Sequence, residues 1–111
     1  MILKVRWIKA AHKSAEGFPL PVQRQIARAL DVAARGEMAE IAKPMKGLGT
    51  GVYEIAVRYR TDAYRAVYAL KLDEDIWVIH AFQKKSTTGI KTPKREIDVI
   101  RQRLARLKEA L

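Results

Sequence analysis

Three runs of alternating apolar and polar residues, joined by short connections, constrain the fold of this chain most strongly. The runs cover residues 52–60, 64–72 and 76–84. In the first run Tyr53, Ile55 and Val57 fall on one side, because successive side chains of a strand point to opposite faces. The connections are too short for a crossover, so the runs predict an antiparallel three-stranded meander. The third run is the most continuously apolar, which predicts a central strand covered on both faces.

The first half of the chain adds a strand and a helix to this meander. Residues 1–8 alternate roughly and predict an N-terminal strand. Residues 10–21 are expected to be a transition, because Gly17, Pro19 and Pro21 signal turns there. Apolar positions recur with helical spacing over the segment that follows. That segment covers residues 22–35, with Gly36 at a C-cap position and a shorter helical piece expected at residues 38–42.

A last helix follows the meander. Pro93 can open it, and Thr92 with Glu96 has the spacing of a capping box. An apolar stripe at intervals of three and four residues predicts its packing face. The stripe consists of Ile97, Ile100, Leu104, Leu107 and Leu111. Residues 1–111 are therefore expected to form a single α+β domain, in which a small antiparallel sheet (N-terminal strand plus three-stranded meander) packs against helices.

The charge balance indicates an acidic partner. Lys and Arg number 22 against 12 Asp and Glu, a net charge of +10. A small domain usually carries a net charge of about 2 to 8 in magnitude. Nucleic acid is the first expectation, a membrane surface the second and an acidic protein the third. A basic surface without such a partner is the structural alternative.

Several classes of site are excluded by residue usage. The chain has no cysteine, so disulfides, thiolate catalysis and Cys-based zinc sites are ruled out. His12 and His80 are far apart in sequence and no metal-binding motif is present, so no metal or other cofactor is expected. The N-terminal residues contain no signal-peptide core, and no apolar run approaches a membrane span of about 20 residues. We therefore expect a cytoplasmic protein without a membrane partner.

Cations converge where the third strand ends. The stretch HAFQKKSTTGIKTP begins at His80 and brings Lys84 and Lys85 without an acid. In an up-down-up meander this end of the sheet also receives the end of the first strand and the start of the second. Those strands carry Arg58 and Arg65. We therefore expect these four cations to lie close together.

Such a cluster suits RNA and its cleavage. Arginines bind phosphates in a bidentate manner, and lysines act as point charges. In cleavage without a metal ion, the 2′-hydroxyl attacks the adjacent phosphate while the protein neutralises charge and moves two protons. Lys84 or Lys85 is a candidate second clamp or base, and Tyr68 and His80 are candidates for proton transfer or base stacking.

The same residues also have structural explanations. Arg58 and Arg65 are possible cross-strand partners of Glu54 and Asp62. A histidine on an apolar strand, as His80 is, is often a hydrogen-bonded core residue.

Two long segments resemble a known family. They are KPMKGLGTGVYEIAVRYRTDAYRAVYAL and WVIHAFQKKSTTGIKTPKREIDVIRQRL. Over residues 22–111 the chain resembles the phage-derived, HigB-like branch of the RelE/ParE toxin superfamily. The resemblance implies a RelE-like fold and the toxin of a type II toxin–antitoxin pair, neutralised by a helix-turn-helix, HigA-like antitoxin in a possible hetero-oligomer. Characterised RelE and HigB relatives are ribosome-dependent mRNA endonucleases that need no metal, whereas ParE relatives poison DNA gyrase.

The resemblance implies that Arg58 and Arg65 correspond to the family's strand arginines and Lys84 and Lys85 to its post-strand lysines, and the expected geometry of the sheet adds the other candidates. The catalytic candidates are Arg58, Arg65, Lys84, Lys85, His80 and Tyr68. The candidate RNA-binding residues are Arg60, Phe82, Lys91, Lys94 and Arg95. Many relatives carry an arginine two residues after the strand glutamate, where this chain has Ala56 after Glu54. Two functions are therefore expected to compete: an mRNA endonuclease, and a non-catalytic module that inhibits gyrase or binds only its antitoxin.

Overall fold

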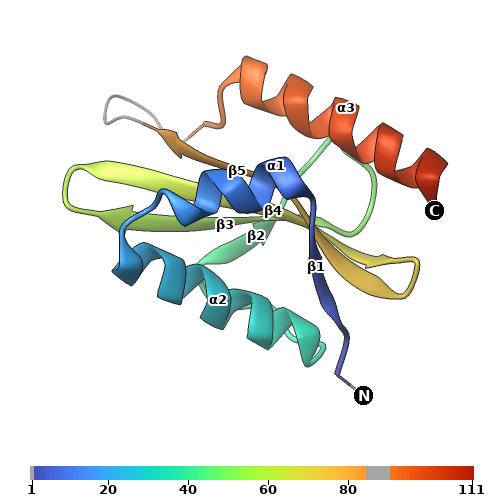
Figure 1. Cartoon of the computed structure of the whole chain (residues 1–111), viewed down its shortest axis with the longest axis horizontal. Coiled ribbons are helices and arrows are strands. Elements are labelled where there is room, and N and C mark those ends of the chain that lie inside the picture. The colour runs from blue at the N-terminus through green and yellow to red at the C-terminus, as the bar shows by residue number, and fades with distance from the viewer. Residues whose placement is uncertain (1, 85–90) are drawn as a thin grey trace.

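The computed structural model describes residues 2–84 and 91–111 and contains one mixed five-stranded sheet with helices on both faces (Figure 1). The strands lie in the order β1-β5-β4-β3-β2. The elements are β1 Val5–Trp7, α1 Lys9–Glu16, α2 Leu20–Ala34, β2 Ala42–Pro44, β3 Val52–Tyr59, β4 Asp62–Leu72, β5 Asp75–Lys84 and α3 Lys94–Ala110. The α+β fold class predicted from the sequence is confirmed. No helix of the described residues is long and apolar enough to cross a membrane.

The meander of β3, β4 and β5 forms as predicted. Both of its strand pairs are antiparallel, with Ile55 opposite Ala66 and Ala66 opposite Ala81. The last strand, β5, is an inner strand that is buried on both faces, although β4 occupies the middle of the sheet. The alternation of apolar residues therefore identified the three strands and their pairing.

The N-terminal strand departs from the prediction of an antiparallel sheet. β1 pairs with β5 in parallel, with Val5 opposite Ile76 and Trp7 opposite Val78. The alternation of a short segment fixes which side chains share a face but not the direction of the strand. The direction is set by packing, since α1 follows β1 directly and lies against β5.

Two local predictions in the first half of the chain are wrong. The expected transition contains the helix α1, whose Ala11 and Ala15 are buried against the sheet. The expected short helix at residues 38–42 does not form, and the chain instead enters the edge strand β2, with Ala42 opposite Ile55. The predicted end of α2 is confirmed, because Gly36 adopts a φ of 91° directly after the C-cap residue.

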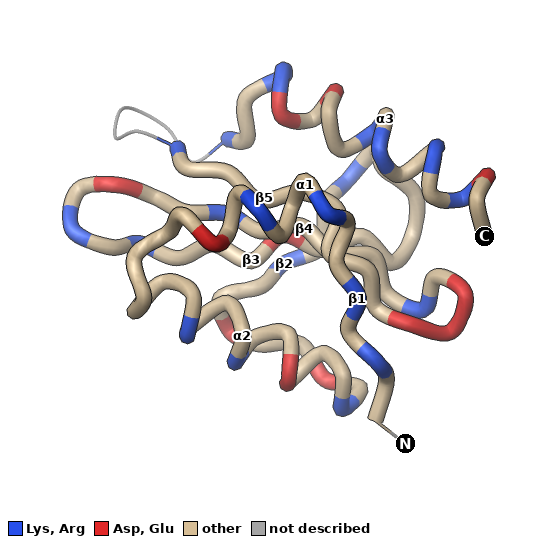
Figure 2. The backbone as a smooth tube through the Cα atoms, viewed as in Figure 1, with Lys and Arg blue, Asp and Glu red and all other residues tan. Residues whose placement is uncertain are grey.

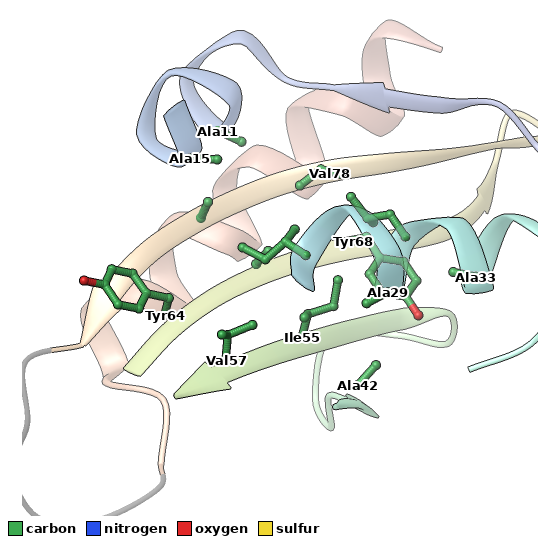
Figure 3. Packing of buried hydrophobic residues seen from close by; sticks show 14 of the residues in the cluster. Ala11, Ala15, Ala29, Ala33, Ala42, Ile55, Val57, Tyr64, Tyr68 and Val78 are labelled. Atoms are coloured by element: carbon green, nitrogen blue, oxygen red, sulfur yellow. The ribbon is translucent and has the colours of Figure 1, made fainter. Parts of the chain in front are cut away.

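Each face of the sheet has its own apolar core. On one face α1 and α2 cover the sheet, and Figure 3 shows Ile55, Val57 and Tyr68 pointing towards Ala29 of α2. On the other face the single helix α3 covers a smaller core. That core contains Leu48, Val52, Val67, Ala69, Ile79, Ile100 and Leu104. The stripe predicted for the last helix is confirmed at Ile100 and Leu104 but fails at Leu111, which is 49% exposed.

The predicted capping box of α3 does not form. Pro93 is the N-cap residue and no side chain caps the helix. The side chains of Thr92 and Glu96 reach across to the sheet instead, where Thr92 contacts Glu54 and Glu96 contacts His80. These two contacts join the start of α3 to the candidate site.

Candidate functional site

The register of the meander brings the predicted cations to one face at one end of the sheet. Arg58 lies opposite Ala63, which lies opposite Lys84. Arg65 is two residues along β4 from Ala63, so its side chain points to the same face. This face is the one covered by α3, and the expected convergence of Arg58, Arg65 and Lys84 is confirmed. Lys85, the fourth predicted cation, lies outside the described residues.

Arg65 is held in a buried ion pair. Its Nη1 donates to Glu54 Oε1 at 2.8 Å, and both residues are buried. The second oxygen of Glu54 accepts a hydrogen bond of 2.6 Å from Thr92 Oγ1. The structural alternative for this arginine is therefore confirmed: Arg65 is the cross-strand partner of Glu54, and its charge is compensated.

Arg58 differs from Arg65 in its surroundings. It is exposed on β3 and makes no ion pair with any carboxylate in the described part of the chain. Asp62, the other acid considered as its partner, instead accepts a hydrogen bond from Gln83 at 2.6 Å. Lys84, at the same end of the sheet, is half-buried and its Nζ donates to the carbonyl of Lys91 at 2.7 Å. A ligand in solution can thus meet Arg58 directly.

His80 joins the sheet to α3 through both ring nitrogens. Arg103 Nη1 lies 3.1 Å from its Nδ1 and also donates to the carbonyl of Ile79 at 3.1 Å. A guanidinium can only donate, so Nδ1 accepts and the ring proton sits on Nε2, which donates to Glu96 Oε1 at 2.8 Å. Burial lowers the pKa of His80 below its ordinary value, against the raising effect of the hydrogen bond to Glu96. His80 is therefore a neutral, fully engaged core histidine.

The two aromatic candidates are buried. Phe82 stacks on His80 with ring centroids 5.1 Å apart and is only 7% exposed. Tyr68 lies on the opposite face of the sheet, under α2, where it stacks on Tyr53 at 5.3 Å. Burial, with a smaller effect of Tyr53, raises the pKa of Tyr68 to about 12. The structure therefore does not bring Tyr68 to the other candidates.

The remaining predicted RNA-binding residues lie around the cluster. Arg60 occupies the β3–β4 turn with a φ of 57°, and its guanidinium lies 5.4 Å from the ring centroid of Tyr59. Three more are exposed, Lys91 just before α3 and Lys94 and Arg95 in its first turn. Lys94 pairs with Asp98 at 3.1 Å, and Arg95 lies 3.7 Å from Glu96.

A cationic groove runs from this cluster between β2 and α3. It has a volume of about 710 Å³. It is lined by Lys43, Pro44, Met45, Lys46, Glu54, Lys91, Thr92, Lys94, Ile97, Asp98 and Arg101. Sequence reasoning missed Lys43, Lys46 and Arg101, because nothing in the local pattern places the loop before β3 beside the last helix. Among the described residues no group of acidic or histidine side chains is arranged to hold a metal ion.

The fold is similar to the folds of solved RelE toxins. An arginine double mutant of the E. coli toxin RelE in the free state is 18% identical with a TM-score of 0.65, covering 96% of this chain and 98% of that one. The isolated E. coli RelE toxin is 20% identical with a TM-score of 0.59, over 79% and 88%. A chain of the RelBE2 toxin–antitoxin complex from Mycobacterium tuberculosis is 14% identical with a TM-score of 0.52, over 76% and 93%. At these identities the likeness shows a shared fold, and it confirms the predicted RelE-like fold.

A family comparison covers most of the chain. No curated protein gives a significant match to this sequence. The model of the family described as Phage derived protein Gp49-like (DUF891) matches residues 13–105, which include the whole sheet apart from β1 and all the described residues of the candidate site. The phage-derived origin indicated by the sequence resemblance is thereby confirmed, and the chain belongs to the Gp49-like family of phage-derived proteins.

Proposed function

We propose that this protein is the toxin of a type II toxin–antitoxin system, of the HigB-like kind, and that it cleaves mRNA on the ribosome without a metal ion. The observation that carries the proposal is the convergence of Arg58, Arg65 and Lys84 on one face of a RelE-like sheet. The cationic groove beside them and the net charge of +10 support a polyanionic substrate. The partner we propose is a helix-turn-helix antitoxin.

The proposed reaction is an internal phosphoryl transfer. The 2′-hydroxyl attacks the adjacent phosphorus, the bond to the 5′-oxygen breaks, and the products are a 2′,3′-cyclic phosphate and a 5′-hydroxyl. Donors aimed at the phosphate oxygens stabilise the charge that develops. Arg58 is exposed for this role, and Lys84 lies on the same face across β4, with Lys85 as a further cation of the proposed set.

Two proposed catalytic residues have to change partners before they can act. Arg65 meets a phosphate only if Glu54 releases its guanidinium. His80 transfers a proton only if a contact to Glu96 or Arg103 opens, because both ring nitrogens are engaged. The substrate phosphate is a suitable competitor for Arg65, since it offers the same bidentate acceptor geometry as a carboxylate.

The test is mRNA cleavage in a translating extract with the purified protein. We expect Arg58→Ala and Lys84→Ala each to reduce the cleavage rate by about 100-fold, the range seen when one charge-stabilising donor is removed. Lys13→Ala, on an exposed position of α1, is the matched control and should cleave at the wild-type rate. Full activity of both site variants, with folding unchanged, would contradict the proposed site.

A non-catalytic binding module is the second candidate function. The observation in its favour is that Arg65 and His80 are both engaged internally, by Glu54 and by Glu96 with Arg103. A protein of this kind would inhibit DNA gyrase or bind only its antitoxin. Absence of cleavage in the extract, together with inhibition in a gyrase supercoiling assay, would favour it.

A further inference from the structure

We propose that the groove between β2 and α3 binds the sugar-phosphate backbone of a single RNA strand and leads it to the cationic cluster. The proposal rests on the proposed function, because it assigns a binding path to the same RNA substrate. The groove residues that carry it are Lys43 and Lys46 on one wall and Lys91 and Arg101 on the other. Three of these four, Lys43, Lys46 and Arg101, were not among the predicted site residues.

The charge of the groove is unbalanced. Five cations line it against two carboxylates, Glu54 and Asp98. Both carboxylates already have partners, since Glu54 pairs with Arg65 at 2.8 Å and Asp98 with Lys94 at 3.1 Å. No ion pair to Lys43, Lys46 or Lys91 occurs within residues 2–84 and 91–111. These amines repel one another in the free protein, and a row of phosphates relieves that repulsion.

The walls of the groove are built before any ligand arrives. Lys43 lies opposite Glu54 in the pairing of β2 with β3, which directs its side chain to the face that α3 covers. On the other wall, Arg101 Nη2 donates to the carbonyl of Gly47 at 3.3 Å and ties α3 to the loop after β2. Gly47 has a φ of 80°, so this loop depends on a conformation that favours glycine. Binding therefore requires little reorganisation of the backbone.

One end of the groove touches the proposed cleavage cluster. Lys91 lines the groove, and its carbonyl accepts the hydrogen bond from Lys84 Nζ. At the same end Thr92 contacts Glu54, the partner of Arg65. An RNA strand that lies in the groove thus continues onto the face of the sheet that carries Arg58 and Lys84. The groove is a subsite for nucleotides on one side of the scissile phosphate.

The experiment measures binding of a short fluorescein-labelled 2′-O-methyl oligouridylate to the purified protein over a salt series. The 2′-O-methyl group prevents cleavage, so binding is measured alone. We expect Lys43→Ala/Lys46→Ala to weaken binding about tenfold at low salt, and to reduce the steepness of log K against log salt by about 0.7 for each lost phosphate contact. The matched control is Lys9→Ala/Lys13→Ala, which removes the same charge from exposed positions of α1 on the opposite face.

The outcomes separate this inference from the proposed function. If both double variants bind the oligonucleotide equally weakly, binding follows net charge alone, and the groove proposal is overturned. If neither double variant loses oligonucleotide binding, and poly-glutamate binds in the groove instead, the result overturns the groove proposal in favour of an acidic protein partner. If Lys43→Ala/Lys46→Ala binds the oligonucleotide as tightly as the wild-type protein does, and the wild-type protein cleaves mRNA, only the groove proposal is overturned. Weakened binding in the groove variant, with no cleavage by the wild-type protein, supports the groove and contradicts the endonuclease.

Discussion

At the scale of single residues, the pair Glu54–Arg65 joins a structural ion pair to the functional role that we propose for Arg65. Both charges are withdrawn from water in the layer between the sheet and α3. Their mutual attraction and the hydrogen bond from Thr92 offset the cost of desolvation. A loss of activity on substituting Arg65 therefore cannot be interpreted until folding has been measured.

A double-mutant cycle can test how much the interaction between Glu54 and Arg65 contributes to the free energy of unfolding. Arg65→Met should lower the free energy of unfolding by about 3–5 kcal/mol, because Glu54 remains as a buried and uncompensated carboxylate. Adding Glu54→Gln removes that charge and should restore much of the loss. Urea denaturation measures the free energy of unfolding of Arg65→Met, of Glu54→Gln and of the double variant. Additive effects of the two substitutions would show that the residues do not interact.

His80 predicts a dependence of stability on pH. Its pKa is lowered in the folded protein, chiefly by burial, so the unfolded chain binds a proton at a higher pH than the folded chain does. The free energy of unfolding should therefore be fully retained above the ordinary value of 6.5 and should fall as the pH decreases below it. His80→Gln removes the titrating group, and its urea midpoint should change less over this window than that of the wild type. Parallel pH profiles would contradict the prediction.

At the scale of elements, α3 is attached by a small apolar contact and by hydrogen bonds that involve Glu96, Arg101 and Arg103. Leu104 is 5% exposed in that contact, so Leu104→Asp would bury a charge and should cost several kcal/mol, about 3 or more. Leu111→Asp, at the C-cap position of α3, is the matched control, because Leu111 is 49% exposed, and it should change stability by less than about 0.5 kcal/mol. Thermal unfolding distinguishes the two variants. Equal stability of both would mean that α3 is not docked.

Sequence patterns predicted the elements whose signals are local. The meander follows from a period of two over three adjacent runs, and α2 follows from its apolar spacing and Gly36. The register alone was enough to bring Arg58 and Lys84 together. Tertiary contacts decided the rest. Thr92 and Glu96 have the spacing of a capping box, yet Glu54 and His80 are their actual partners, and nothing near them in sequence indicates this.

Distant contacts also explain the elements that the sequence did not predict. The helix α1 contains only 8 residues and is followed by Gly17 and Pro19, so its local signal resembles a turn region. Its buried face forms only where β5 lies under Ala11 and Ala15. The cationic groove joins β2 to α3, two elements about 50 residues apart, as the contact between Arg101 and Gly47 shows. Local patterns do not encode such a pairing.

At the scale of the whole molecule, charge is separated along the sheet. Figure 2 shows an acidic segment at the β4–β5 turn, at one end of the sheet. The turn consists of Asp73 and Glu74, and Asp75 follows as the first residue of β5. The candidate site lies at the other end of this strand, which has 11 residues. At about 3.3 Å per residue the two ends are roughly 33 Å apart. This separation orients the cationic end towards an approaching polyanion.

The parallel pairing of β1 with β5 also has a consequence for the order of folding. Val5 lies opposite Ile76, so β1 can reach its place only after β5 has been synthesised. Closing a loop of this length is slow compared with forming the hairpins of β3, β4 and β5. Val5→Ala should therefore accelerate unfolding while leaving the refolding rate nearly unchanged, as stopped-flow fluorescence would measure. During translation, a strand that leaves the ribosome well before its partner is then among the last to be protected from proteases.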